Sequence, residues 1–534
     1  MSTYTIKKFG GSAPRIAEHL LGDSTAALAV DCKLWHGTLE SWREPQQIRS
    51  IDSDIRTSVL YDCCWIDFDT AVDVAYGPVN CRKLFTTGAR EWPAVHEFNE
   101  CEMTVRRLGL PCPYKMPSVA GATPNNNKSI EGRSYAYQFR NAAGERSALS
   151  QASVAQLFAD GQSVVVSGWE VPDASWGVTH VRIFRAVSGH QSGREPSNVL
   201  DTVWMFVGEV AVNAASFTDN KYNEDLIEAL EEDIAAPPPA ELRGMVWIKS
   251  MNALAGFVGK RIYFSENNSY HHWPYHLDLD DNVCALVESN GVLYAATDGA
   301  PYAITADVDC ENAGCRRATR LPVIYPMVGC GNRRMAALPQ GAVYPTHDGL
   351  VMLSGTNAPV LLTEPLYAPD DWHKLYPESV IPVWFNGWLF VFAREKGFVL
   401  TLNKSNGLDT HSQLSDRDVI DAFVSRQGDF YIVKTDAVYQ WDRGSRLRDH
   451  RWRSPDLVAP TMLNFGAARL WHEHGEEQVK ITVDGREVID RGVLASRVFR
   501  LPMWAEGSVW RVELSGTAKV KLFSMATSMH ELGA

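Results

Sequence analysis

The sequence predicts an all-β protein: a β-propeller with an inserted fibronectin-like β-sandwich and a C-terminal β-sandwich or jelly-roll-like domain. Three observations lead to this prediction. Frequent turn residues, 39 Gly and 27 Pro in 534 residues, break the chain into short apolar runs. One hairpin pattern recurs along the second half of the chain, and clusters of strand-like runs lie before and after it. Such spacing is typical of sandwiches and propellers rather than helical proteins.

Residues 1–125 form an N-terminal segment that we expect to contribute to the propeller. Ser24 precedes an Ala-rich run that ends at Val30, and this pattern predicts a short helical piece. A strand-like run follows at Val59–Phe68. The polar, Pro- and Asn-rich stretch Ala122–Lys128 is typical of a linker, and it ends the segment.

Residues 126–238 contain five short strand-like runs, which favour a small inserted β-sandwich of the fibronectin type. The run of prolines at 237–239 closes this region. The predicted strands are Tyr135–Phe139, Ser163–Trp169, Val178–Ala186, Val203–Val212 and Phe217–Asp219.

Residues 239–455 carry the repeats that predict the propeller blades. Each repeat has a polar residue and a Gly, an apolar strand, a short turn and a second apolar strand, and Gly256–Ser265 is a divergent copy. A hairpin that recurs every 40–50 residues is typical of propeller blades. The alternative is a set of unrelated hairpins in an ordinary β-protein. The four clear repeats begin at Asn290, Gln340, Asn386 and Gln427.

Residues 456–534 predict a separate C-terminal β-domain. Asp484-Gly485 is a strong hairpin-turn signal directly after an apolar strand. The predicted strands are Val479–Val483, Val498–Leu501, Trp510–Leu514 and Val520–Phe523.

The formal net charge of −13 argues against a protein that grips nucleic acid through its phosphates. The ten cysteines include no C-x-x-C pair, so we expect neither a zinc site nor a secreted disulfide framework, and we expect reduced thiols. The longest apolar stretch, Val380–Ala393, is interrupted by Pro382 and by Asn386-Gly387. It is too short to span a bilayer and predicts two strands and a turn, so no membrane insertion is expected.

No nucleophile elbow, phosphate-binding loop, metalloprotease or dinucleotide-binding motif occurs, so the protein is predicted not to be an enzyme and to need no cofactor or metal.

Three residue clusters are possible sites. His271, His272 and His276 are close in sequence, but no carboxylate or Cys lies at ligand spacing, and an inter-blade loop is favoured. Asp307–Glu311 resembles the start of a calcium loop without its Gly and Glu. The basic run Arg443–Arg453 favours a solvated loop over a phosphate or acidic-partner contact.

Segments along nearly the whole chain resemble the tail nozzle proteins of podoviruses, also called tail tubular protein B or packaged-DNA stabilisation proteins. The opening carries the densest likeness, at Phe9–Pro14, Leu20-Leu21, Ala26–Asp31, Leu34–Leu39 and Arg43–Pro45. Further segments are Ser134–Ser150, Val181–Arg185, Gly256–Pro274, Phe499–Pro502, Trp510–Thr517 and Ser528–Leu532.

The resemblance implies a structural virion protein of the phage tail, assembled in the host cytoplasm. Its copies would form a ring, commonly of six, below the portal and adaptor proteins, with residues 1–125 contributing to the adaptor contact. The ring would extend the channel for duplex DNA, help to retain the packaged genome and anchor tail fibre, spike or needle proteins. The family carries no catalytic residues. The candidate partner-interface residues are Phe9, Gly10, Gly11 and Pro14 in the opening and Arg446 and Arg448 in the basic run.

Two other functions remain open from the sequence. One is a carbohydrate-binding or glycan-cleaving propeller protein of a phage tail or a bacterium, although Trp169 and Trp176, the obvious stacking candidates, are predicted to lie in the sandwich core. Glycan cleavage also needs a pair of carboxylates, and none can be singled out. The other is a plain scaffold that does not contact DNA.

Overall fold

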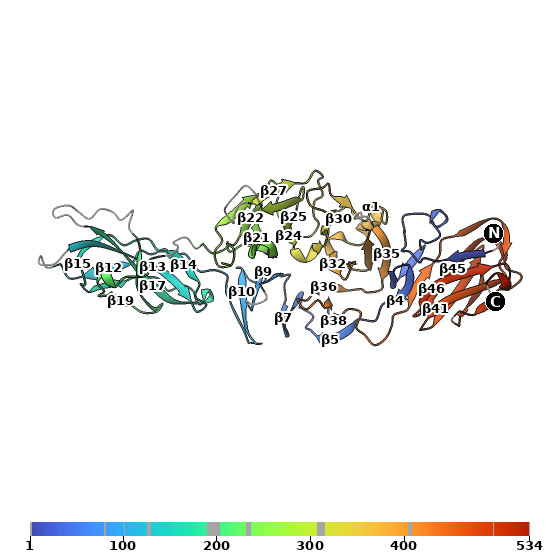
Figure 1. The fold of residues 1–534 in the computed structure, drawn as a ribbon, viewed down its shortest axis with the longest axis horizontal. Coiled ribbons are helices and arrows are strands. Elements are labelled where there is room, and N and C mark those ends of the chain that lie inside the picture. The colour runs from blue at the N-terminus through green and yellow to red at the C-terminus, as the bar shows by residue number, and fades with distance from the viewer. Residues whose placement is uncertain are drawn as a thin grey trace. The chain divides into compact units, whose positions relative to one another are not determined.

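The computed structural model describes residues 3–78, 82–100, 102–124, 130–189, 203–230, 236–306, 316–403, 408–494 and 496–532 (Figure 1). Within these residues the fold contains 46 strands and a single α-helix, α1 (Pro369–His373), of five residues. The all-β prediction is therefore confirmed. No helix in the described part of the chain is long and apolar enough to cross a membrane.

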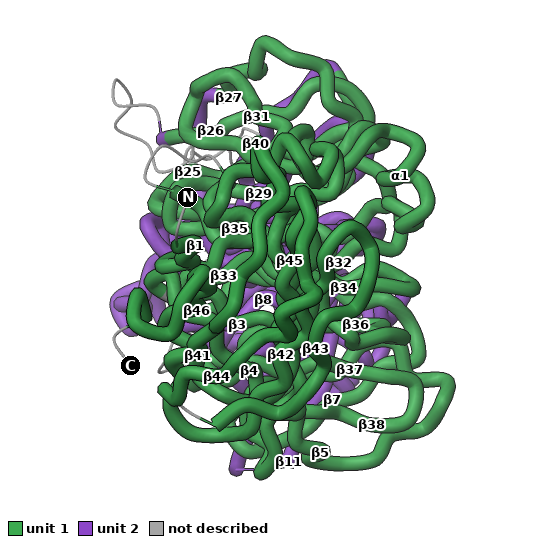
Figure 2. The backbone as a smooth tube through the Cα atoms, turned by 90° about the vertical axis from the view of Figure 1, so that its right-hand side faces the viewer, with its two compact units in different colours: residues 1–72, 281–305, 318–534 green, residues 73–280, 306–317 purple. Residues whose placement is uncertain are grey.

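The chain divides into two compact units (Figure 2). Unit 1 comprises residues 1–72, 281–305 and 318–534, and unit 2 comprises residues 73–280 and 306–317. Each unit therefore combines segments that lie far apart in the sequence.

Groups of four antiparallel strands follow one another along the middle of the chain. Two groups are separate sheets of strands in sequence order, a third forms one end of a ten-stranded sheet, and in the fourth the N-terminal strand β5 (Gln46–Ser50) pairs with β38. Their strands are β24 (Val283–Ser289), β25 (Val292–Thr297), β26 (Tyr302–Ala306) and β27 (Arg316–Arg320); β28 (Ala336–Leu338), β29 (Gly341–Pro345), β30 (Leu350–Leu353) and β31 (Val360–Leu361); β32 (Ile381–Phe385), β33 (Trp388–Phe392), β34 (Gly397–Leu402) and β35 (Leu408–Leu414); and β36 (Val419–Val424), β37 (Phe430–Lys434) and β38 (Ala437–Gln440).

The four predicted hairpin repeats are confirmed as the second and third strands of these sheets. Local turn chemistry explains why they could be recognised. Asn290 and Gly291 both have positive φ, 51° and 83°, and Asn386 and Gly387 have φ of 48° and 86°. Two successive positive φ angles define the type I′ hairpin turn that Asn-Gly favours. The stretch Val380–Ala393 accordingly forms two strands and a turn, as predicted.

Consecutive sheets of unit 1 pack against one another through apolar faces. Their first strands contact each other in series, β24 with β28, β28 with β32, and β32 with β36. One buried cluster joins the β24–β26 and β28–β30 hairpins, a second joins β28–β30 to β32–β34, and a third joins β32–β34 to β36–β37. Burial of these apolar faces is the main stabilising contribution to this part of the fold.

The Ala-rich run near Ser24 is extended, so the helix predicted there is wrong. Strand β2 (Leu28–Val30) lies between β35 and β39 (His450–Arg453) and pairs with both. Backbone pairing on its two sides outweighs the high intrinsic helix propensity of alanine, which is worth less than about 1 kcal/mol per residue. Only the short 3₁₀ turn Glu18–Leu20 is helical in this region.

The C-terminal strands belong to two sheets, and N-terminal strands complete both of them. Strands β1 (Thr3–Ile6) and β4 (Thr38–Ser41) pair with β46, and β3 (Cys32–Trp35) pairs with β4. The two sheets enclose one apolar core in which Trp510 is fully buried. The C-terminal strands are β40 (Leu457–Asn464), β41 (Ala467–Glu473), β42 (Glu477–Val483), β43 (Arg486–Gly492), β44 (Val498–Arg500), β45 (Glu506–Gly516) and β46 (Lys519–Ala526).

The inserted region of unit 2 has two sheets around one apolar core. Strand β12 precedes the linker and pairs with β16. Trp169 lies in the core, as predicted. The strands are β12 (Ser118–Gly121), β16 (Val164–Ser167) and β19 (Ser216–Asp219) in one sheet, and β13 (Ile130–Asn141), β14 (Arg146–Leu149), β15 (Gln156–Ala159), β17 (Val178–Gly189) and β18 (Met205–Ala211) in the other.

Unit 2 also contains two four-stranded sheets that pack together, and the divergent repeat Gly256–Ser265 forms the central hairpin of the second one. A network of four charged side chains joins the inserted sandwich to the first sheet. Its distances are Lys83–Glu97 3.0 Å, Lys83–Glu145 3.1 Å, Arg106–Glu97 2.8 Å and Arg106–Glu145 2.8 Å. The sheets are β8 (Asp73–Tyr76), β9 (Lys83–Thr87), β10 (Ala94–Asn99) and β11 (Glu102–Arg107), and β20 (Arg243–Ile248), β21 (Ala253–Val258), β22 (Arg261–Phe264) and β23 (Tyr275–Asp278).

The cysteines differ in part from the expectation of reduced thiols. Cys32 and Cys284 are free and buried, whereas Cys63, Cys112 and Cys330 are exposed. Cys64, in the hairpin of β6 (Thr57–Tyr61) and β7 (Cys64–Phe68), is disulfide-bonded. Disulfide formation depends on which side chains the fold brings together, and sequence spacing alone does not reveal this.

Candidate partner-binding site

The N-terminal segment that carries the densest family likeness is built into the interior of unit 1. Phe9 is 1% exposed and meets the ring of Trp452 edge to face at 5.0 Å. The indole of Trp452 donates a hydrogen bond to the carbonyl of Gly10 at 3.0 Å. A Cβ on Gly11 would lie 2.1 Å from the backbone nitrogen of His411, so only glycine fits there. These three residues therefore stabilise the fold, and Phe9 and Gly11 are not accessible to a partner.

A hydrogen-bond relay centred on the buried His411 follows directly after this segment. Ser12 Oγ lies 2.8 Å from His411 Nδ1, and Tyr367 Oη lies 3.0 Å from His411 Nε2. Burial lowers the pKa of His411 to about 4, and burial raises the pKa of the Tyr367 hydroxyl, so both groups are neutral at pH 7. A neutral imidazole offers one donor and one acceptor, and the two hydroxyls satisfy both. The relay thus fixes the orientation of Tyr367.

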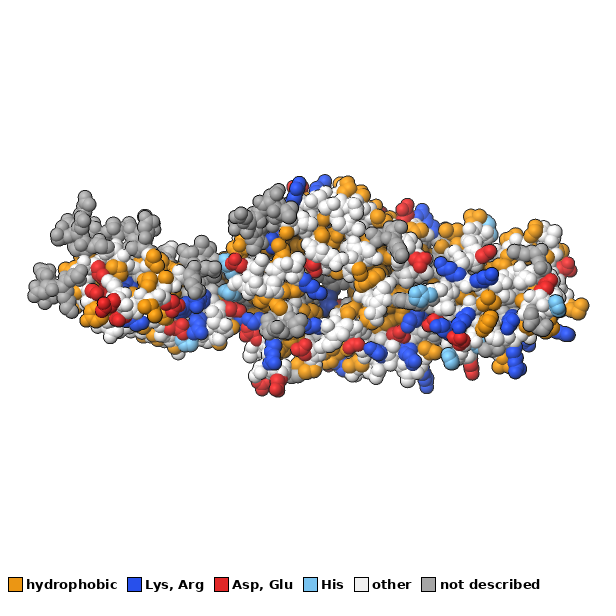
Figure 3. Space-filling view, in the orientation of Figure 1, with side chains coloured by type: hydrophobic (Ala, Val, Ile, Leu, Met, Phe, Trp, Pro, Cys, Tyr) orange, Lys and Arg blue, Asp and Glu red, His pale blue; other side chains and the backbone are white. Residues whose placement is uncertain are grey.

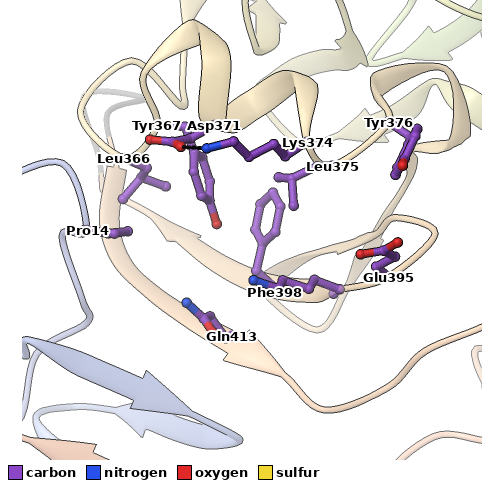
Figure 4. Close-up of a pocket in the computed structure, with 12 residues that line it drawn as sticks. Pro14, Leu366, Tyr367, Asp371, Lys374, Leu375, Tyr376, Glu395, Phe398 and Gln413 are labelled. Carbon is purple, nitrogen blue, oxygen red and sulfur yellow. Dashed lines mark hydrogen bonds and ion pairs between the residues drawn. The ribbon is translucent and has the colours of Figure 1, made fainter.

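Tyr367 and Pro14 line a pocket of about 600 Å³ in unit 1 (Figure 4). Leu375 and Phe398 point toward one another in its interior, and Lys374 forms an ion pair with Asp371 at 2.7 Å on its rim. The other lining residues are Leu366, Tyr376, Glu395, Lys396, Gly397 and Gln413.

The pocket combines an apolar interior with rim charges of both signs. Such a surface suits an apolar side chain of a protein partner, with polar groups at the edge. Of the strongly perturbed groups beside it, His411 is buried and Tyr367 is half-buried, and they are already hydrogen-bonded to each other. The arrangement therefore favours docking over catalysis.

Most of the basic run Arg443–Arg453 forms ion pairs within unit 1. Arg448, predicted as an interface residue, bridges two buried carboxylates and also stacks on Trp441 at 4.8 Å. Arg446 is exposed and forms no ion pair within the described residues. The ion pairs are Arg443–Asp429 (3.5 Å), Arg448–Asp31 (3.3 Å), Arg448–Asp416 (2.6 Å), Arg451–Glu513 and Arg453–Glu18 (2.7 Å).

The histidine cluster has structural contacts between β22 and β23. His272 accepts a hydrogen bond from the backbone of Ala236 at 3.0 Å and lies 3.5 Å from a Glu266 carboxylate oxygen. Burial lowers the pKa of His271. No group of three or more His, Cys, Asp or Glu side chains within the described ranges is placed to hold a metal ion. Asp307–Glu311 lies outside the described residues.

Of the six predicted interface residues, Pro14 lines the pocket and is exposed, Arg446 is exposed, and the other four make internal contacts. The rest of the pocket carries no sequence motif. Its lining comes from residue 14, from residues 366–376 and from residues 395–413, which only the fold brings together.

Comparisons with known proteins do not identify a family for this chain. No family model and no curated protein matches it. Among solved structures, a functionally unknown protein from Desulfotomaculum acetoxidans DSM 771 is 8% identical, with a TM-score of 0.27, over 71% of this chain and 98% of that one. Sqt1 of Saccharomyces cerevisiae is 10% identical, with a TM-score of 0.26, over 74% and 98%. A luciferin-regenerating enzyme is 8% identical, with a TM-score of 0.21, over 40% and 83%.

Proposed function

We propose that the four groups of strands in unit 1, β24–β27, β28–β31, β32–β35 and β36–β38 with β5, are the blades of a β-propeller. Three features support this arrangement: the strands within each group pair in an antiparallel order, the first strands contact one another in series, and apolar clusters fill the space between consecutive groups. The pairing of N-terminal β5 with β38 gives the last sheet its fourth strand. An N-terminal strand that completes the last blade would cover the exposed edge of that blade. Closed β architectures avoid exposed strand edges in this way.

We propose that the protein is a structural subunit of a podovirus-type tail nozzle ring. The observation that carries the proposal is the architecture, a chain of β-sheets with an inserted sandwich and a C-terminal sandwich that N-terminal strands complete. The N-terminal residues that resemble the nozzle family form the connection between the last four-stranded sheet and the C-terminal sandwich. The pocket beside Pro14 and the exposed Arg446 are the proposed contacts with neighbouring proteins, namely further copies, adaptor or other tail components.

The charge distribution suits a conduit through which duplex DNA passes without adhesion. The net charge is −13, and the basic run is largely neutralised by carboxylates of the same chain. Figure 3 shows basic and acidic side chains interspersed over the visible face. Each cation that pairs with a phosphate releases counterions, and a ring would multiply that contact by its copy number. A ring channel lined by more acidic than basic side chains would therefore let duplex DNA pass without binding it.

The proposal is tested by the mass of the purified full chain in solution, by particle images and by a duplex DNA titration at several salt concentrations. We expect rings, alone or with a co-expressed adaptor, and weak DNA binding. A strictly monomeric protein that also forms no ring with adaptor would contradict the proposal. Tight, salt-sensitive binding of free duplex would contradict the non-adhesive lumen.

A further inference from the structure

One end of the inserted sandwich in unit 2 carries a second, smaller pocket of about 270 Å³. It lies between the chain that enters β12, strand β13 and the 3₁₀ turn η2 (Ala174–Trp176). The volume falls just below the range of drug-sized ligand sites, so the pocket fits a small ligand or one ring of a larger one. Its lining residues are Pro111, Cys112, Tyr114, Phe139, Glu170, Val171, Pro172, Asp173 and Trp176.

The aromatic part of this pocket is exposed. Tyr114 is 71% exposed and Val171 is 63% exposed, although both line the pocket. Trp176, predicted to be core, is only half-buried. The guanidinium of Arg107 lies 4.9 Å above the Trp176 ring and 5.3 Å from the Trp92 ring, so it holds the indole in place from one side. Exposed aromatic groups at a concave site are typical of binding surfaces.

The polar part of the pocket consists of hydrogen-bond acceptors in fixed positions. Glu170 is buried, and its carboxylate accepts hydrogen bonds from the Tyr137 hydroxyl and, at 2.9 Å, from the backbone of Tyr114. Asp173 accepts from the backbone of Ser175 at 2.9 Å through Oδ1. Hydrogen bonds from Ser175 lower the pKa of Asp173, so this exposed carboxylate is ionised at neutral pH. Its Oδ2 points to no hydrogen-bond donor in the described structure and can accept one from a ligand.

We propose that this pocket binds one residue of a neutral saccharide. A sugar ring presents C–H faces that pack on Trp176 and Tyr114, and hydroxyl groups that donate to Asp173. Two carboxylates in the lining repel an acidic sugar. A proline-rich peptide also packs on aromatic grooves, but its backbone carbonyls offer acceptors where the pocket already has acceptors. The site is a binding site without cleavage, and it is independent of the proposed nozzle function.

The test is saturation-transfer NMR and calorimetry on the full chain with five probes. These are the methyl glycosides of glucose, galactose and mannose, free N-acetylglucosamine, and N-acetylneuraminic acid as the acidic comparison. A proline-rich decapeptide forms a further arm. We expect at least one neutral sugar to bind and the acidic sugar and the peptide not to bind. Binding of the peptide alone, or of no neutral sugar, would overturn the proposal.

Three variants locate the site. Trp176→Ala, Tyr114→Ala and Asp173→Asn should each weaken sugar binding by about tenfold or more. Trp504→Ala is the matched control, because Trp504 is 61% exposed but lies in the C-terminal domain. Tyr114 is highly exposed, so its variant should fold even if Trp176→Ala does not. Sugar binding that survives Tyr114→Ala and Asp173→Asn unchanged would place the site elsewhere and refute the assignment.

Discussion

The charge network between the inserted sandwich and the sheet β8–β11 makes a quantitative prediction for Glu145→Gln. Burial alone raises the pKa of Glu145, but the Arg106 and Lys83 cations outweigh burial and lower it from 4.5 to about 2. A difference of that size corresponds to about 3 kcal/mol of stabilisation at neutral pH. The change to Gln keeps the shape of the side chain and removes the charge, so it should remove most of this contribution.

The pH dependence has a definite sign. Because the pKa is lower in the folded chain than in the unfolded chain, the stabilisation is complete above pH 4.5 and is lost as the pH falls through about 2. The wild type and Glu145→Gln should therefore differ most at neutral pH and converge near pH 2. The assay is amide hydrogen exchange, whose intrinsic rate itself depends on pH. This intrinsic rate is the same in both proteins at a given pH, so it cancels in the comparison.

Hydrogen exchange measured by mass spectrometry is the suitable assay, because the full chain has two units and a single unfolding free energy is not defined for it. We expect the β13–β14 turn to exchange roughly 100-fold faster in Glu145→Gln at neutral pH. Glu473→Gln is the control, since its ion pair with Lys521 is solvent-exposed and should contribute little. Equal exchange of the turn in wild type and Glu145→Gln across this pH range would refute the reasoning.

Three further predictions concern the rest of the chain. Trp510→Ala should destabilise the C-terminal sandwich by roughly 3–5 kcal/mol, because the ring is fully buried, and unchanged hydrogen exchange of β45 would contradict this. Gly11→Ala should destabilise unit 1 by about 3 kcal/mol, because its Cβ would overlap the His411 backbone, whereas Gly22→Ala, with its nearest atom at 3.9 Å, should be nearly neutral in thermal melts. Limited proteolysis should cut at Ala122–Thr123, which is exposed, before residues 237–239, where Pro238 is buried; first cleavage inside β16–β18 would be inconsistent with a folded sandwich.

Local patterns in the sequence were enough to predict several strands and hairpins of this protein. The Asn-Gly turns at 290–291 and 386–387 and the Asp-Gly turn at 484–485 each adopt two positive φ angles. That requirement depends on two adjacent residues only, so it can be recognised without knowledge of the fold. The same holds for the alternation of apolar residues, which predicted the C-terminal strands β42, β44, β45 and β46.

Pairings between distant segments were decided by the tertiary structure alone. The Ala-rich run became strand β2 because β35 and β39 offered partners on both sides, and β1, β4 and β5 joined sheets formed by residues several hundred positions away. The two pockets arise in the same way, from residues that share no motif. Trp169 and Trp176 are similar in sequence context, yet one is core and the other lines a pocket. Burial depends on which other segments cover a side chain, and a single sequence specifies local conformation much more directly than it specifies those neighbours.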